Sequence, residues 1–296
     1  RLLGEAHFLR AMYYFRLVRL FGGVPKIENV VYSSADWNQS RASSDEIYAF
    51  IKEDLEKANQ ELWVKSAYSD EDLGRATKGA AQAMLLKVNL YTKDYEAAEA
   101  WGDSIMASQE YSLCPNYKDN FTLAGENGQE SVFEIQYSED PTSDYGEGDG
   151  FTRGTFTLVL TRSRALDGWG FNKPTQNLYD AYETDDPRRD ITILKPSSFV
   201  NESEEIYLGD PYLSRKYAMY DEYPEKTNLH ASRGPLNYKV IRYADVLLMY
   251  AEACCENNAL DKAKNALNEV RDRARGSLAT TVLPDFPYGS YSLNQD

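Results

Sequence analysis

The chain has 296 residues, with 32 Lys and Arg against 47 Asp and Glu, and a formal net charge of −15. This balance argues against nucleic acid as a partner, because neutralising phosphates requires clustered Lys and Arg, and it disfavours an anionic membrane surface. The mean hydropathy is −0.59, and the sequence holds no stretch of the roughly 18 apolar residues that a membrane-spanning helix needs. Its three cysteines show neither a disulfide framework nor a metal-ligand spacing.

The first part of the chain is predicted to be helical. Residues 1–21 form a helix that the Gly-Gly-Val-Pro segment at 22–25 ends, since glycine adopts the left-handed cap and proline cannot continue a helix. Ser43 and Glu46 have the spacing of a capping box, which begins a second helix. The apolar residues of this helix share one stripe: Ile47, Phe50, Ile51, Leu55, Ala58 and Leu62.

Two helical pairs are predicted further along. Residues 78–108 form a helix-turn-helix whose first helix is rich in alanine, and its Asp-Tyr-Glu-x-Ala turn resembles that of a tetratricopeptide repeat. Near the C-terminus an apolar helix begins at Val240. A second helix over 260–275 has one apolar stripe, and Arg271, Arg273 and Arg275 lie near its end, where they suit the helix dipole.

Between these pairs the periodicity changes. Phe133, Ile135 and Tyr137 alternate with polar residues, as in a half-buried strand, and residues 156–160 are interpreted as another strand. Residues 138–236 are rich in Gly, Pro, Asp and Tyr, which indicates a loop-rich excursion. The predicted fold class is therefore mainly α, a helical scaffold with tetratricopeptide-like helix-turn-helix pairs plus a loop-rich excursion containing a few short strands.

Five segments, in order along almost the whole chain, carry a family resemblance. They are 5–15 with 20–25, 74–81, 133–136, 174–188 and 242–274. Together they resemble the SusD/RagB family, the surface nutrient-binding lipoproteins of Bacteroidetes. The resemblance implies a single domain over 1–296, with a scaffold at 1–130 and 237–276 and a ligand-binding excursion at 131–236. It also implies truncation at both ends, because the family's export signal, lipidated cysteine, first helices and C-terminal segment have no counterpart.

The resemblance implies a capture protein and not an enzyme, without cofactor or metal. Such a protein binds oligosaccharide or polysaccharide on the extracellular face of the outer membrane and delivers it to a SusC-like TonB-dependent transporter; a lipid anchor would belong to the full-length protein. Two alternatives stay open, capture of peptide or another nutrient and a helical protein-interaction scaffold. No local motif promotes hydrolysis, and His7 and His230 are interpreted as structural.

A glycan site needs exposed aromatic rings for the apolar sugar faces, beside amide, carboxylate or guanidinium groups for the hydroxyls. Two loops offer this combination, around Trp37 and around Trp169, and glycines flank Trp169. The alternative is that both indoles pack against the protein, as most Trp side chains do. Trp63 and Trp101 are predicted to be core. The predicted ligand-binding residues are Trp37, Asn38, Tyr145, Arg164, Trp169, Phe171 and Asn172.

Tyr145 lies in a loop rich in glycine and acidic residues, 144–150. Its acids could hold Ca²⁺, but they do not follow the alternating pattern of a calcium loop. The segment is therefore interpreted as a flexible acidic loop.

Overall fold

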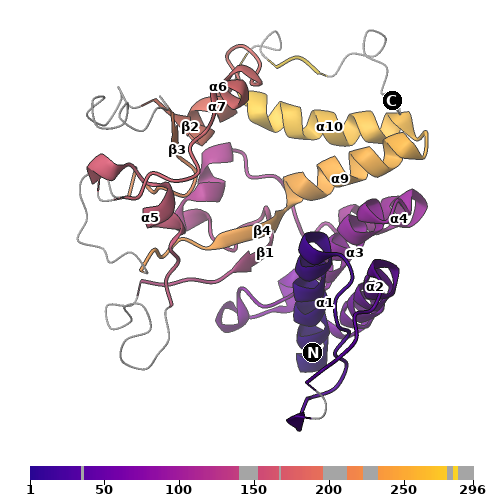
Figure 1. The fold of residues 1–296 in the computed structure, drawn as a ribbon. Coiled ribbons are helices and arrows are strands. Elements are labelled where there is room, and N and C mark those ends of the chain that lie inside the picture. The colour runs from indigo at the N-terminus through magenta and orange to yellow at the C-terminus, as the bar shows by residue number, and fades with distance from the viewer. Residues whose placement is uncertain are drawn as a thin grey trace. The chain divides into compact units, whose positions relative to one another are not determined.

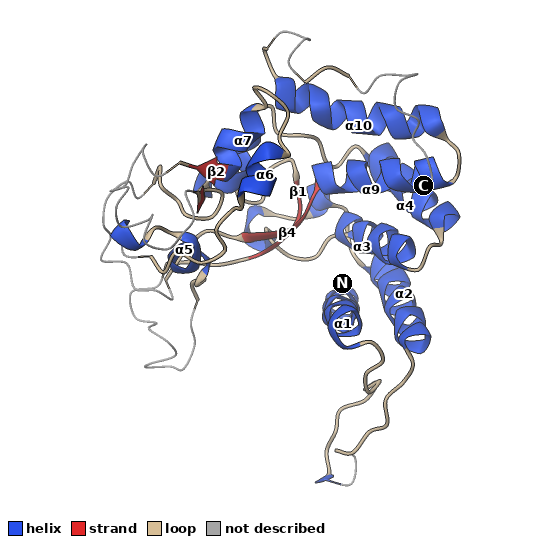
Figure 2. Cartoon of the chain, turned by 45° about the horizontal axis from the view of Figure 1, so that its top comes forward, coloured by secondary structure: helices blue, strands red, loops and turns tan. Residues whose placement is uncertain are grey.

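The computed structural model describes most of the chain: residues 1–34, 37–139, 153–166, 168–195, 212–222, 233–278 and 283–285. Over these residues the fold is mainly helical with short strands, as the sequence predicts (Figure 2). None of the described helices is long and apolar enough to cross a membrane. The chain divides into two compact units: unit 1 includes Arg1–Ser112 and Ile241–Leu267, and unit 2 includes Leu113–Val240 and resumes at Asn268.

Unit 1 is a set of packed α-helices (Figure 1). They are α1 (Leu2–Phe21), α2 (Ser44–Glu61), α3 (Lys78–Tyr91), α4 (Tyr95–Ser108) and α9 (Tyr243–Glu256). The short 3₁₀ helices η2 (Lys65–Ala67) and η3 (Asp70–Asp72) lie between α2 and α3 in the sequence. From α1 to α4 each helix packs against the next, and α9 packs against α3 and α4. The predicted helix-turn-helix is the α3–α4 pair.

Local signals in the sequence decide where these helices begin and end. Gly22 ends α1 with a φ of 68°, a left-handed conformation that glycine adopts without steric cost. The predicted capping box is formed: the Glu46 N–H donates to Ser43 Oγ at 3.2 Å, and the Ser43 N–H donates to Glu46 Oε2 at 2.8 Å. The apolar stripe of α2 is buried at every predicted position: Ile47, Phe50, Ile51, Leu55, Ala58 and Leu62.

Helices α4 and α9 approach closely at Gly102. A Cβ atom at this position would lie 2.4 Å from Cδ2 of Tyr250, which is closer than packed atoms can come. The Tyr250 hydroxyl donates to the carboxylate of Asp103, the next residue of α4. The absence of a side chain at Gly102 therefore allows α9 to pack against the α3–α4 pair.

Hydrogen bonds join the two ends of the loop between α1 and α2, close to the helices. The Arg41 guanidinium donates to the carbonyl oxygens of Phe21 at 2.6 Å and Gly23 at 2.7 Å. Pro25 and Arg41 form an antiparallel bridge, so the two ends of the loop run side by side. The rest of this loop projects away from α1 and α2 (Figure 2).

Unit 2 is built from short elements. Its helices are α5 (Thr157–Thr161), α6 (Gln176–Asp180), α7 (Pro187–Thr192), η4 (Tyr117–Phe121), η5 (Leu123–Gly125) and η6 (Arg164–Leu166). Its strands are β1 (Ser131–Ile135), β2 (Ile193–Leu194) and β3 (Leu213–Ser214). β2 and β3 pair in antiparallel fashion, with Ile193 opposite Ser214. The predicted division into a scaffold and an excursion over 131–236 stays a prediction.

Two elements run from one unit into the other along the sequence, β4 (Tyr238–Arg242) and α10 (Leu260–Arg275). β4 pairs with β1 in a two-stranded sheet. The prediction that a helix begins at Val240 is wrong, because residues 238–242 extend as a strand and α9 begins only at Tyr243. β-Branched Val240 and Ile241 suit a strand.

The prediction of a strand over 156–160 is also wrong, since this segment is α5. A short apolar run fits either conformation, and periodicity alone does not distinguish them. The hydroxyl of Thr155 accepts the backbone N–H of Thr157 at 3.1 Å and so satisfies a donor at the start of the helix. The Thr161 hydroxyl returns to the Thr157 carbonyl at 2.8 Å.

Neither indole predicted to be core is fully buried. Trp63 follows the end of α2 and is 47% exposed, so the prediction that it lies in the core is wrong. The chain turns into an extended conformation at Leu62, which takes Trp63 off the apolar stripe of the helix. Trp101 lies within α4 and is half-buried.

β1 is more deeply buried than the predicted half-buried strand. Its polar residue Glu134 is only 2% exposed and forms an ion pair with Lys239 of β4. Asn237 donates to the Glu134 carboxylate at 3.1 Å, and its backbone N–H donates to Glu126 at 2.7 Å. Burial raises the pKa of the Glu126 carboxyl. These contacts satisfy the charge of Glu134 inside the unit.

The three arginines near the end of α10 do more than suit the helix dipole. Each reaches a carboxylate of unit 2: Arg271 bonds to Glu183, Arg273 to Glu130 and Arg275 to Asp285. Glu130 is completely buried and also accepts hydrogen bonds from the backbone of Cys114 and the amide of Asn120, both at 2.9 Å.

Candidate functional site

The loop that follows α5 folds back onto that helix. Trp169 and Phe171 donate their backbone N–H groups to the α5 carbonyls of Val159 and Leu160, each at 2.7 Å. Gly170 donates to the carbonyl of Arg162 at 2.9 Å. The last carbonyls of a helix lack partners within the helix, so the returning loop satisfies groups that would otherwise face water. The backbone of this loop is therefore fixed by α5.

Arg162 holds the loop from inside. Arg162 is 2% exposed. Its Nε donates to the Leu166 carbonyl at 3.0 Å, and an Nη donates to the Ala218 carbonyl at 2.9 Å. Gly168 passes directly over it. A Cβ at Gly168 would lie 2.1 Å from the Arg162 carbonyl oxygen, so no side chain fits there.

Three rings meet at the surface of this loop. Trp169 and Phe171 contact edge to face, with centroids 6.1 Å apart and planes at 75°. Phe156 lies at the start of α5, and its ring centroid is 6.4 Å from that of Trp169. Trp169 is 39% exposed and Phe171 is 52% exposed. We call Phe156, Trp169 and Phe171 the aromatic platform.

Polar groups accompany the platform. Arg164 is exposed, and its Nε donates to the Trp169 carbonyl at 3.2 Å. Asn172 is exposed and adopts a φ of 54°, which turns the chain directly after Phe171. The structure thus places four of the predicted residues on one short loop of unit 2: Arg164, Trp169, Phe171 and Asn172.

The remaining predicted residues lie elsewhere in the chain. Trp37 and Asn38 are exposed in unit 1, on the projecting loop between α1 and α2, and Trp37 is 73% exposed. Tyr145 lies outside the described residues, as does His230. The Nδ1 of His7 contacts buried Asp54 at 3.0 Å, in keeping with the structural role predicted for it.

Sequence reasoning missed Phe156 and Arg162. The sequence pattern predicts a strand at Phe156, whereas in the structure α5 begins directly after it and its ring lies beside Trp169. Arg162 sits at the junction of helix and loop, where an arginine is expected to be exposed, and nothing in the sequence marks it as buried. The glycines around Trp169 are the signal in the sequence that points to this loop. Gly168 is required because a side chain there would collide with the backbone of Arg162.

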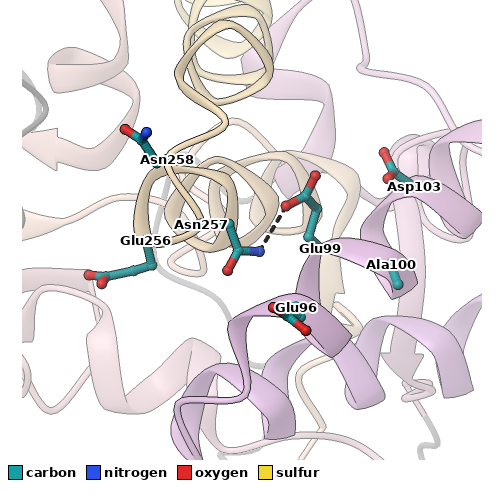
Figure 3. Close-up of a pocket in the computed structure, with 7 residues that line it drawn as sticks. All are labelled: Glu96, Glu99, Ala100, Asp103, Glu256, Asn257 and Asn258. Atoms are coloured by element: carbon teal, nitrogen blue, oxygen red, sulfur yellow. Dashed lines mark hydrogen bonds between the residues drawn. The ribbon is translucent and has the colours of Figure 1, made fainter.

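A recess lies in unit 1, beside α4 and the end of α9 (Figure 3). This cavity of about 550 Å³ is lined by Glu96, Glu99, Ala100, Asp103, Glu256, Asn257 and Asn258. Hydrogen bonds from Lys262, at 2.8 Å, and from Asn257, also at 2.8 Å, hold the pKa of Glu99 below its ordinary value. Its lining is acidic and has no aromatic ring, so it lacks a face on which a sugar could stack.

Comparison with known proteins places the chain among SusD-like proteins. The SusD family pattern matches residues 194–282, and the SusD-like family described as "Starch-binding associating with outer membrane" matches residues 1–90. SusD-like protein P38 of Formosa agariphila is 27% identical over 96% of this chain and 59% of its own length. The chain thus spans about three fifths of that relative.

Solved structures agree with the sequence comparison. A laminarin-binding SusD-like protein matches with a TM-score of 0.79 and 28% identity, over 97% of this chain and 65% of that one. Surface glycan-binding protein A from Bacteroides thetaiotaomicron, in complex with laminarihexaose, matches with a TM-score of 0.75 and 25% identity, over 93% and 62%. Both family matches, the relatives and the fold together support the SusD/RagB family for this chain.

Proposed function

We propose that this protein captures glycans, with sugar rings stacking on the aromatic platform. The observation that carries the proposal is the anchoring of the platform loop. Trp169 and Phe171 are tied to α5 through their backbone while both side chains remain at the surface. Rings held in this way lose little conformational freedom when a ligand binds.

The surroundings of the platform fit the same ligand. The apolar C–H face of a sugar matches a flat ring, and the hydroxyls around it need donors and acceptors. Arg164 and Asn172 are exposed beside the platform and provide both. Trp37 and Asn38 are proposed as further ligand contacts on the projecting loop, and Tyr145 as another outside the described residues.

The similar proteins support a glycan as the ligand. One binds laminarin and another was solved with laminarihexaose, so this fold carries sugar sites in proteins 25–28% identical to the chain. The family description also supports a place at the outer membrane. We propose that the full-length protein is lipid-anchored on the extracellular face and delivers the glycan to a SusC-like TonB-dependent transporter without chemical change.

Calorimetric titration of the full-length protein against laminarihexaose, laminarin, maltohexaose and starch tests the proposal. Trp169→Ala is expected to weaken binding about tenfold, or roughly 1.4 kcal/mol, because it removes the largest ring of the platform. Trp63→Ala is the matched control, since it removes an indole of similar exposure from outside the platform. Equal affinity for the two variants, both folded, would remove Trp169 from the site, and no binding to any glycan would reject the proposal.

A further inference from the structure

Unit 2 exposes one more aromatic ring that the platform does not include. Among its described residues, the large aromatic side chains exposed to solvent are Trp169, Phe171 and Tyr238. Tyr238 is 46% exposed and begins β4, outside the platform loop.

The Tyr238 ring is supported from behind. It stacks on Tyr217, with centroids 5.9 Å apart and planes at 26°. Tyr217 in turn meets the edge of Phe121 at 6.1 Å and packs against a small buried core. A ring that is stacked on one side and exposed on the other presents a flat apolar face to solvent.

The backbone of Tyr238 is fixed by its neighbours. Asn237 is 2% exposed and is bound to Glu134 and Glu126, and Lys239 is 8% exposed and pairs with Glu134. Successive side chains of a strand point to opposite faces. Burial of Lys239 therefore holds Tyr238 on the opposite, exposed side of β4, and little freedom remains to be lost on binding.

Tyr238 and the platform are both supported by α5. Leu158 of α5 shares a buried cluster with Met219 and Leu236, and Tyr217 packs on this cluster. The next residue of the helix, Val159, accepts the backbone N–H of Trp169. Since Leu236 precedes Tyr238 by only two residues, the same short helix positions both exposed aromatic faces.

Charged side chains belong to the same short segments of the chain as Phe121 and Tyr217. Lys216 Nζ is 4.9 Å from the ring centroid of Phe121. Lys118 and Asp221 pair at 2.9 Å, and each side chain is 41% exposed. Groups of this kind can bond to the hydroxyl rim of a sugar whose face lies on an aromatic ring.

We propose that Tyr238, backed by Tyr217, is a second sugar-stacking position, and that the ligand is an extended glycan chain contacting both Tyr238 and the platform. This rests on the proposed function and narrows its ligand class. A chain too short to reach both rings binds only at the platform, whereas a longer chain gains a second stacking contact within the same molecule.

Titration with laminaritriose and laminarihexaose separates the two positions; maltotriose and maltohexaose replace them if the wild type prefers starch. Tyr238→Thr removes the ring while keeping a residue suited to a strand. It is expected to weaken six-sugar binding at least fivefold and to change three-sugar binding less than twofold. Tyr238→Phe keeps the ring and is expected to retain affinity for both.

Tyr13→Ala is the matched control, because Tyr13 is 61% exposed on α1 of unit 1. Trp169→Ala should weaken both ligands. If Tyr238→Thr behaves like Tyr13→Ala while Trp169→Ala still loses affinity, the second position is rejected and the glycan-binding proposal stands. If Tyr238→Thr loses the same affinity for the three-sugar and the six-sugar ligand, the proposal that one extended chain contacts both positions is rejected. Failure of the wild type to bind either series rejects both proposals.

Discussion

At the scale of single residues, close approaches decide where the candidate site can form. Gly168 has no room for a side chain because it crosses the backbone of Arg162. Arg162 is buried and bonds to carbonyls on both sides, at Leu166 in the loop and at Ala218 beyond it. The exposed position of Trp169 therefore depends on Gly168 and Arg162, which are not among the proposed ligand contacts.

Gly168→Ala is expected to disturb the platform without removing any aromatic ring. The new Cβ would collide with the Arg162 carbonyl oxygen, so the loop must shift, at a cost of about 1–3 kcal/mol. Thermal unfolding and glycan titration should both show a loss, with glycan affinity falling by at least as much as in Trp169→Ala. Gly128→Ala is the control, since its Cβ would come no closer than 3.2 Å to another atom. Wild-type affinity in Gly168→Ala would show that the anchored loop does not determine binding.

At the scale of elements, buried charges join segments that are distant in the sequence. Lys239 of β4 pairs with Glu134 of β1, and Arg273 of α10 pairs with Glu130, immediately before β1. Glu134 lies in the family-like segment 133–136, and Arg273 in the family-like segment 242–274. These residues that suggested the family from the sequence therefore have structural roles, and the proposed ligand contacts are separate from them.

Lys239→Met is expected to destabilise unit 2 by about 3–5 kcal/mol, because it leaves the buried carboxylate of Glu134 without its counter-charge. The double variant Glu134→Leu/Lys239→Met removes both charges and should recover part of the loss. Urea unfolding of the two single variants and the double variant measures the coupling. Additive effects of the two substitutions would show that the pair is not coupled.

At the scale of the whole molecule, carboxylates that the fold holds in their ionised form make stability sensitive to acid. Several described carboxylates have a lowered pKa, among them Glu99 in unit 1, through its hydrogen bond from Lys262, and Glu183 in unit 2, through its hydrogen bond from Arg271. A lowered pKa means that the folded state favours the ionised form. This stabilisation is complete above the ordinary glutamate pKa of 4.5 and is lost as the pH falls through the folded-state value.

Stability is therefore expected to fall between pH 5 and about pH 3, and Glu99→Gln and Glu183→Gln should each make the fall less steep. Chemical denaturation across this range measures the free energy of unfolding for each variant. Exposed Glu71, which is in neither contact, provides the control variant Glu71→Gln. If the free energy of unfolding of Glu99→Gln and Glu183→Gln falls with pH as steeply as that of Glu71→Gln, these two contacts do not govern the acid response.

The sequence by itself determined the helices of unit 1, because their signals are local. The capping box at Ser43, the glycine stop at Gly22 and the apolar stripe of α2 each depend on residues within a few positions of one another. The family could also be predicted from sequence, since its characteristic segments include residues that pack, cap and pair inside the fold.

Only the tertiary structure decided the conformation of α5, the burial of Arg162 and Glu134, and the placement of the rings. Phe156–Leu160 fits a helix or a strand until the returning loop bonds to its carbonyls. Arg162 is buried because distant segments supply its acceptors. Tyr238 and Trp169 are about 70 positions apart in the sequence, and only packing around Leu158 brings both onto the support of one short helix. Such contacts join residues far apart along the chain, and no local pattern records them.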